Sequence, residues 1–290
     1  MRYKFIDRQK KAYPIVVLCR VMRVCRSGYY SWRRHGKSSH RQRNESLLPL
    51  VREIHRVSGS SYGARRISKK LQGHGFKCGR VRSRTLMKLA GITAKGRRKF
   101  KVTTNSKHNL PVAENLLNRQ FEVTQPNRVW GSDITYVWTR QGWIYLAVVL
   151  DLFSRRVVGW AMSNRITRHL VMDALNMAFY RRHPAPGLIF HSDRGSQYCS
   201  NDFQMMLKRN GMICSMSRKG NCWDNAPLES FFGTLKTERV FNSNYKTREQ
   251  ARKDIVDYIE MFYNCQRLHS YLGYLSPMDF EKMKTLKKSA

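Results

Sequence analysis

The sequence is short of acidic residues. Its 290 residues include 55 Lys and Arg but only 19 Asp and Glu, which gives a formal net charge of +36. The shortage is greatest in residues 1–120, which hold 31 basic and 4 acidic side chains. Such an excess requires a polyanionic partner, for which nucleic acid is the leading candidate and an anionic membrane surface the alternative.

The sequence also lacks a long apolar run and a secretory leader. A transmembrane helix needs about 18 or more consecutive apolar residues, and we find no such run. Residues 1–11 are polar and basic and contain no small-residue cleavage site. We therefore expect no membrane partner and a cytoplasmic protein associated with the nucleoid.

Cysteine is present, but not in a paired pattern. The seven cysteines are irregularly spaced and include no C-x-x-C pair, which argues against both a zinc ribbon and a disulfide scaffold. We expect reduced thiols that act mostly as small buried apolar side chains in a cytosolic protein.

Composition and periodicity divide the chain into five regions. We expect a basic helical segment (1–40), a helix-turn-helix-like domain (41–95), a basic linker (96–125), an α/β core (126–245) and a helical C-terminal extension (246–290). The chain is long enough for more than one domain, and 41% hydrophobic residues are typical of a globular protein rather than a disordered one.

The front half is expected to contain only helices. Apolar spacing predicts helices over residues 13–24, 46–57, 62–71 and 78–91. The last two, separated by a glycine-containing turn, have the layout of a helix-turn-helix, whose second helix enters the DNA major groove. The alternative is a solvated basic face on a small helical bundle. The candidate DNA contacts on these two helices are Arg65, Arg66, Arg80, Arg82, Arg84 and Lys88.

Several connecting stretches are expected to be irregular. Ser27–Gly28 predicts a turn, and residues 36–45 predict a polar basic linker. Residues 92–110 have no periodicity and predict an extended segment that could follow a phosphate backbone. Residues 111–125 contain one short helical pattern.

The sequence pattern changes at residue 127, where β-branched and aromatic residues begin to alternate. Helices are predicted over 167–182, 200–211 and from Asn225 to Arg239. The order predicts a ribonuclease H-like mixed five-stranded sheet with flanking helices, whose first three strands form an antiparallel meander. Most of the tryptophans of this region, Trp130, Trp138, Trp143 and Trp160, are expected in the core. The predicted strands are 127–139, 142–154, 155–163, 187–193 and 212–217.

Three acidic residues stand at positions that favour a site. Asp133 interrupts a predicted strand, where a carboxylate loses solvation unless it is paired or metal-bound. Asp193 ends the fourth strand, and Glu229 lies on the helix that follows residue 225. First and fourth strands are neighbours in this topology, so the three carboxylates can converge. Oxygen ligands without His or Cys suit Mg²⁺, or Mn²⁺ in its place, and two such ions can promote phosphodiester chemistry.

The same three positions carry a family resemblance. The segments WGSDITY, HSDRGSQY and DNAPLESFFGTLKTE contain Asp133, Asp193 and Glu229, with 35 residues between the last two. They resemble the DDE triad of bacterial insertion-sequence transposases with a retroviral-integrase-like catalytic core. YGARRI in the front half and YNCQRLHSYLGYLSP near the C-terminus extend the resemblance over essentially the whole chain.

The resemblance implies a chemistry and partners. It implies strand cleavage at an element end, followed by attack of the freed 3′-hydroxyl on another phosphodiester, with Asp133, Asp193 and Glu229 as catalytic metal ligands. Lys236, seven residues after Glu229, is implied to contact DNA near the reacting end. The chain looks like the second-frame product of a two-frame element, which implies fusion or partnership with the first-frame product. Synapsis of two DNA ends implies a homo-oligomer.

Other interpretations stay open. Glu229 and Lys236 lie on the same side of a helix. Taken alone, this pair is typical of a solvated helix face. A ribonuclease or resolvase of the same fold, and a non-catalytic DNA-binding regulator, are the rival functions. We also predict a hinge at Lys219–Gly220 and Asp224–Asn225, which would hold Glu229 away from the aspartates without DNA or metal. Each of the following residues has a structural and a functional interpretation: His191, Ser192, Trp223, Asn225, Asn264, Arg267 and His269.

Overall fold

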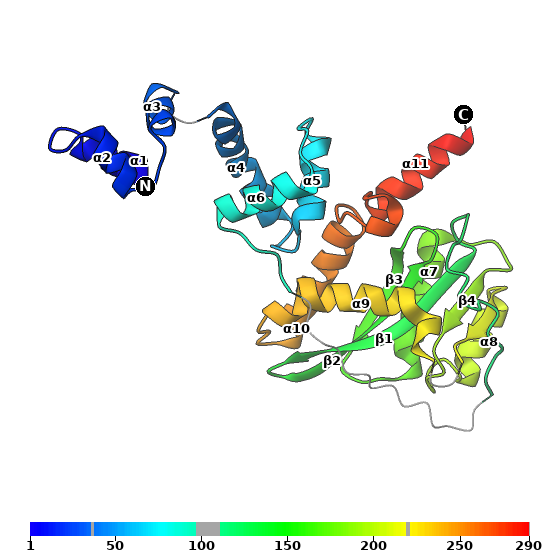
Figure 1. Cartoon of the computed structure of the whole chain (residues 1–290). Helices are drawn as coiled ribbons and strands as arrows, with labels where there is room; N and C mark the ends of the chain where they lie inside the picture. The colour runs from blue at the N-terminus through cyan, green and yellow to red at the C-terminus, as the bar shows by residue number, and fades with distance from the viewer. Residues whose placement is uncertain (36–37, 97–110, 219–220, 290) are drawn as a thin grey trace.

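The computed structural model describes residues 1–35, 38–96, 111–218 and 221–289. Three hydrophobic clusters organise this part of the chain, one in the N-terminal helices and one on each face of a central sheet. In Figure 1 the N-terminal helices lie apart from the rest, and the helices that follow them lie between them and the sheet. The predicted linker residues 97–110 and the hinge residues Lys219–Gly220 lie outside the described residues.

The N-terminal cluster is formed by α1 (Arg2–Gln9), α2 (Ile15–Val21) and α3 (Arg26–His35) around Ile6 and Tyr29. The turn predicted at Ser27–Gly28 is wrong, because α3 begins at Arg26 and runs through it. Gly28 serves close packing instead, since a Cβ there would collide with the hydroxyl of Tyr3.

The helix α4 (Ser39–Val57) is longer than predicted and includes most of the supposed linker 36–45. Its first turn is capped by Ser38, whose side chain accepts a hydrogen bond from the Arg41 amide at 3.3 Å. Leu47 packs in the core and orders this polar start.

The predicted helix-turn-helix layout is confirmed in its secondary structure. It consists of α5 (Ala64–Gly73) and α6 (Arg80–Ala90), which pack against each other and against α4. Gly91 ends α6 in the left-handed conformation at φ 69°, as a helix-terminating glycine commonly does.

The sheet has the predicted mixed five-stranded topology, with the order β3-β2-β1-β4-β5. The first three strands form an antiparallel meander, and β4 and β5 run parallel to β1. The fold is therefore ribonuclease H-like, preceded by an all-helical region. The strands are β1 (Val129–Thr139), β2 (Gly142–Asp151), β3 (Arg156–Ser163), β4 (Ile189–Ser192) and β5 (Ile213–Met216).

Helices cover both faces of the sheet. One face packs on α7 (Arg168–Arg182) and α8 (Asn201–Arg209). The other packs on α9 (Ala226–Glu238) and α10 (Arg248–Asp257), which continues as a π-helix over Tyr258–Tyr263. In Figure 1, α9 crosses in front of β1. The chain ends in α11 (Pro277–Ser289).

Two predictions around the sheet are wrong. Residues 111–125, all of which are described, contain no helix, although a short one was predicted. Trp130 is fully buried as predicted, whereas Trp138 and Trp143 are exposed. The pair lies near the β1–β2 turn, and α7 packs on β2 and β3 rather than on this end of β1.

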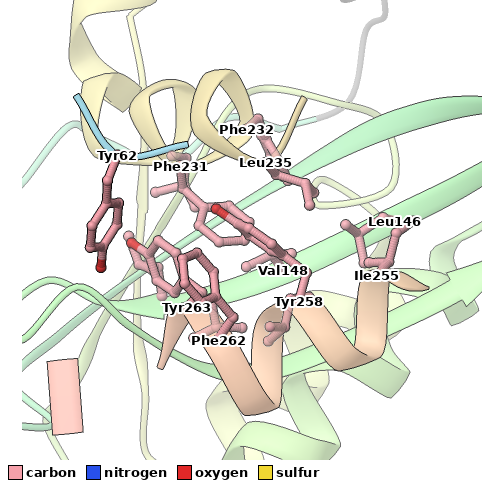
Figure 2. Packing of buried hydrophobic residues seen from close by; sticks show 14 of the residues in the cluster. Tyr62, Leu146, Val148, Phe231, Phe232, Leu235, Ile255, Tyr258, Phe262 and Tyr263 are labelled. Atoms are coloured by element: carbon pink, nitrogen blue, oxygen red, sulfur yellow. The ribbon is translucent and has the colours of Figure 1, made fainter. Parts of the chain in front are cut away.

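The front helices and the sheet share one core. Figure 2 shows Tyr62, from the segment before α5, beside Phe262 and Tyr263 of the π-helix, which in turn approach Phe231 of α9. The Tyr62 hydroxyl accepts a hydrogen bond from the Leu268 amide at 2.8 Å. The helical region is therefore docked on the α9 side of the sheet. Within the described residues, no helix has the length and apolarity required to cross a bilayer.

Candidate active site

The strand register brings the two predicted aspartates side by side. Ser132 of β1 pairs with Ser192 of β4 at the last position of this parallel ladder. Asp133 and Asp193 directly follow these two residues, so both lie where β4 ends. Asp193 accepts a hydrogen bond from the Gly195 amide at 3.0 Å, and Asp133 accepts one from the Ile134 amide at 2.7 Å. Backbone donors therefore fix both carboxylates.

The electrostatics of this pair are unfavourable without a cation. Loss of solvation, followed by the charge of Asp193, raises the pKa of Asp133 well above its ordinary value. The charge of Glu229 adds to the increase, whereas the Ile134 amide and Lys236 oppose it. The charges of both other predicted ligands therefore act on Asp133. A buried carboxylate with a raised pKa beside a second carboxylate is an arrangement that a bound cation would stabilise.

Close packing of α9 on β1 sets the position of Glu229. A Cβ on Gly131 would lie 2.6 Å from a methyl group of Leu228, so only glycine allows this approach. Glu229 follows Leu228 in the first turn of α9, near the end of β1 that carries Asp133. Its side chain is largely exposed, although partial desolvation raises its pKa. Among the described residues, no three His, Cys, Asp or Glu side chains form a group that could hold a metal ion.

Lys236 lies inside the protein rather than on a solvated helix face. The residue is 4% exposed, and its Nζ lies 4.8 Å from the ring centroid of Tyr136. Burial lowers the pKa of Lys236 to about 8, against the opposing charge of Asp133. Lys236 therefore offers a partly desolvated ammonium group beside the carboxylates.

Two buried residues of β4 and its surroundings support the site. His191 is held by Ser215 at 2.9 Å and Ser217 at 3.2 Å, and burial lowers its pKa to about 4. Tyr198 bonds Ser132 at 2.9 Å, and its own pKa is raised by burial and by both aspartates. His191 is thus a structural residue, whereas Tyr198 lies near the carboxylates. Nothing in the sequence pattern singles out Tyr198 except its place five residues after Asp193.

The turn before α9 does not act as predicted. Asn225 occupies the N-cap position, but its side chain makes no capping bond and its buried Oδ1 has no partner among the described residues. Asp224 is buried and accepts hydrogen bonds from Arg119, Arg218 and Asn115, which hold its pKa far below the usual range despite burial. So many bonds argue against a hinge at Asp224–Asn225. Trp223 is exposed.

The opposite end of α9 carries a second buried carboxylate, Glu238. Arg267 donates to both of its oxygens, at 2.9 Å each, and Tyr258 donates at 2.8 Å. Two residues of the front region reach the same place, Arg66 at 3.3 Å from Oε1 and Lys95 at 2.8 Å from the backbone carbonyl. The last turn of α9 is therefore bonded to the helical front region.

Three of the residues with two interpretations, Asn264, Arg267 and His269, lie after the π-helix and are partly or fully buried. The Asn264 side chain donates to the Val157 carbonyl and accepts from its amide. Arg267 is occupied by Glu238. His269 is half-buried, and its pKa is lowered to about 3 by burial and nearby arginines, which favours a neutral ring.

Five of the six predicted DNA-contact residues on α5 and α6 line a single cavity of about 660 Å³. Its lining contains no Asp or Glu and also includes Ser270 and Tyr274 from the C-terminal extension. Arg82 is different, because it donates to Asn44 at 2.9 Å and to the Lys77 carbonyl, and is not among the lining residues. The five lining cations are Arg65, Arg66, Arg80, Arg84 and Lys88.

Known sequence families match three segments of the chain. Residues 42–100 match an HTH-like domain, and residues 123–222 and 229–285 match two integrase core domain families. The fold and the matches together define a protein with an integrase core domain and a DNA-binding helical region in front of it.

Relatives extend over the whole chain. Transposase InsF of insertion sequence IS3A from Escherichia coli (strain K12) is 44% identical, over 97% of this chain and 98% of the relative. The uncharacterized 31 kDa protein of insertion element IS600 from Shigella sonnei is 47% identical, over 91% of this chain and 97% of the relative. The chain belongs to the transposase family of insertion sequence IS3.

Solved structures give more distant likenesses. A chain of the simian T-cell lymphotropic virus intasome with a PP2A regulatory subunit is 17% identical with a TM-score of 0.47, covering 80% of this chain and 74% of that chain. The catalytic core domain of HTLV-2 integrase in complex with magnesium is 17% identical with a TM-score of 0.41, covering 54% and 97%. Likenesses this distant transfer no residue roles to this chain.

Proposed function

We propose that this transposase cleaves DNA strands at insertion-sequence ends and joins the freed 3′-hydroxyl to a target phosphodiester. The observation that supports it is the pair of adjacent carboxylates, Asp133 within β1 and Asp193 directly after the parallel strand β4, with Glu229 close enough for its charge to act on Asp133. In the proposal these three are the catalytic residues. No serine or cysteine nucleophile is required for this chemistry, because water or a hydroxyl attacks directly.

The residues fit hard divalent cations. The site presents carboxylate oxygens, which Mg²⁺ and Mn²⁺ prefer, and the pKa of Asp133 is raised first by burial and then by the charge of Asp193, both of which a bound cation would offset. Asp133, Asp193 and Glu229 would hold two ions, which when bound supply activation of the attacking oxygen and stabilisation of the leaving oxygen. Glu229 completes the ligand set by moving toward the aspartates.

In the same proposal Lys236 places the reacting strand. Its ammonium group lies beside Asp133 and over Tyr136, and burial has already removed much of its water. A phosphate next to the scissile bond would gain a charge-assisted hydrogen bond there. Lys236 therefore orients DNA relative to the carboxylates without taking part in proton transfer.

The front region is proposed to hold DNA by its backbone. Five cations line one cavity whose lining contains no Asp or Glu, which suits phosphates, although one of them, Arg66, also pairs with Glu238. Arg82 is assigned a structural bond to Asn44 instead. The function requires two DNA ends in one complex, so we propose a homo-oligomer in synapsis. The product of the upstream reading frame is the proposed fusion or binding partner.

The test is strand cleavage and joining on duplex DNA carrying the ends of the element that encodes this chain. The reaction is run with Mg²⁺, with Mn²⁺ and with chelator, each with and without the upstream product. We expect joined products that require the divalent ion and disappear in Asp193→Asn. Cleavage that survives Asp193→Asn refutes the assigned site. DNA binding without cleavage under every condition supports a regulator instead.

A further inference from the structure

We propose that the aromatic array on the β1–β2 hairpin binds unpaired nucleobases of the DNA strand beside the reacting phosphate. The array is defined as Tyr136, Trp138, Trp143 and Tyr145. The inference rests on the proposed strand-transfer function and adds to it a binding site for bases.

The strand register places these four side chains on one face. Tyr136 and Trp138 alternate along β1, and their partners on β2 are Tyr145 and Trp143, respectively. The Trp143 ring meets the rings of Tyr136 and Trp138 edge-on, at centroid distances of 5.0 and 4.8 Å. This packing holds the rings in place, so a base that stacks on them finds a preformed surface.

The array is open to solvent where a core would be closed. Trp138 is 57% and Trp143 42% exposed, whereas Val137 and Ile144, on the opposite face of the same strands, are buried beneath α9 and α10. The core beneath α7 includes Ala147 of β2, and Tyr145 packs only at its edge. Exposure of two adjacent tryptophans costs hydrophobic free energy that a folded protein normally recovers by binding.

The array is continuous with the candidate active site. Asp133 and Tyr136 point to opposite faces of β1, and the link between the array and the site is Lys236 of α9, whose ammonium group lies over the Tyr136 ring. A strand whose phosphate reaches Lys236 and the carboxylates would therefore have its neighbouring nucleotides beside Trp138 and Trp143. Aromatic rings can stack on any base, so this contact needs no particular sequence.

The charge around the array favours DNA over a second copy of the chain. Residues 134–150 include no Asp or Glu, and Arg140 lies in the hairpin turn. Arg248 of α10 donates to the Trp143 carbonyl at 3.1 Å, which adds a second guanidinium group. Another copy would carry its own +36 charge to this cationic rim, whereas a nucleic acid strand carries the opposite sign.

The experiment measures binding of a fluorescein-labelled 12-nucleotide thymidine oligomer to the full chain, without divalent ions, by anisotropy. We expect Trp138→Ala and Trp143→Ala to bind about 5- to 150-fold more weakly, the loss of one stacked base. Trp138→Phe retains a ring and keeps most of the affinity. Tyr180→Ala is the matched control, because Tyr180 is 71% exposed but lies on α7, and it leaves binding unchanged. A blunt duplex of the same length, whose bases are stacked internally, is affected little by any of these changes.

Two results overturn the inference. The first is unchanged oligomer affinity in both alanine variants, and the second is an equal loss for oligomer and blunt duplex. If the first is accompanied by reduced self-association in sedimentation, the array is assigned to contact with a second copy instead. Circular dichroism melting of each variant excludes a folding defect. Because no metal is present, stacking can be confirmed even if strand cleavage fails, and cleavage can persist if stacking fails.

Discussion

The two ends of α9 both carry carboxylates near other charges, but the charges have opposite signs. Near its start lies Glu229, whose negative charge, together with burial and Asp193, raises the pKa of Asp133 well above its ordinary value. At its end, Glu238 is held by Arg267, Arg66 and Tyr258. The charge of Glu238 is balanced by residues of the chain itself. The carboxylates near the start of α9 would be stabilised by a bound cation. The difference separates a structural ion pair from a binding site.

The largest expected effect comes from a substitution at the carboxylate site near the start of α9. We predict that Asp193→Asn lowers strand cleavage by at least about 10²–10³-fold, the size of effect expected when one element of electrostatic stabilisation is removed. Its free energy of unfolding should not fall, because a charge that repels Asp133 is gone. Product analysis on gels and urea unfolding give the two measurements. A large loss of stability in this variant would show that the pair is structural.

The second largest expected effect comes from a substitution of Glu238, the ion-paired carboxylate at the end of α9. We expect Glu238→Gln to lower the free energy of unfolding by about 3–5 kcal/mol, because Arg267 is then buried without its counter-charge. Glu53→Gln is the control, since Glu53 bonds Arg56 at the surface and should change stability little. Equal stabilities of the two variants in urea unfolding would contradict this difference between buried and exposed pairs.

A pH series sharpens the comparison further. The pKa of Asp133 is raised in the folded protein, so its contribution to stability is present below its ordinary value of 3.8 and is lost as the pH rises through the folded value. Asp133→Asn should therefore become more stable relative to the unaltered chain as the pH increases from about 4 to 8. Melting temperatures in chelator give the measurement.

Magnesium should reverse the pH effect in the unaltered chain only. Binding requires ionised carboxylates, so Mg²⁺ should raise the melting temperature at pH 8 more than at pH 5. Asp133→Asn, which has lost a ligand, should show a smaller increase at both. An equal increase in both proteins would mean that the ion binds elsewhere.

The smallest effect concerns the front cavity. Arg84→Ala should reduce the slope of log affinity against log salt by about 1 for a 20-base-pair duplex, as expected for one lost phosphate contact. Lys77→Ala removes an exposed cation that does not line the cavity. This variant should therefore reduce the slope less than Arg84→Ala does. Identical slopes for the two variants would remove the cavity from the DNA-binding surface.

Much of the fold follows from local patterns. Alternation and β-branched residues located the strands, and the topology they imply placed Asp133 beside Asp193, as the parallel pairing of β1 with β4 confirms. The carboxylate site could therefore be proposed from sequence, since it depends on strand order and on the residue at each strand end. The catalytic and metal-binding roles of these residues are still predictions.

What could not be predicted depends on long-range packing. Trp138 and Trp143 have the sequence pattern of buried strand residues, but their exposure depends on how far α7 extends over the sheet. Lys236 looked solvated on an isolated helix, and its burial depends on the docking of α9 beside Tyr136. Gly28 had the pattern of a turn, but its role is to let Tyr3 approach. Each error concerns a neighbour distant in sequence or an adjacent element.

The bonds at Glu238 also restrict how such proteins can exchange parts. Tyr62, Arg66 and Lys95 of the front region meet the end of α9 and the segment after the π-helix. A chimaera that takes its front region from one relative and its core from another must keep these three contacts compatible, or lose the bonds that join the front region to Glu238 and Leu268. Recombination between elements is therefore expected to succeed more often when the front region and α9 are inherited together.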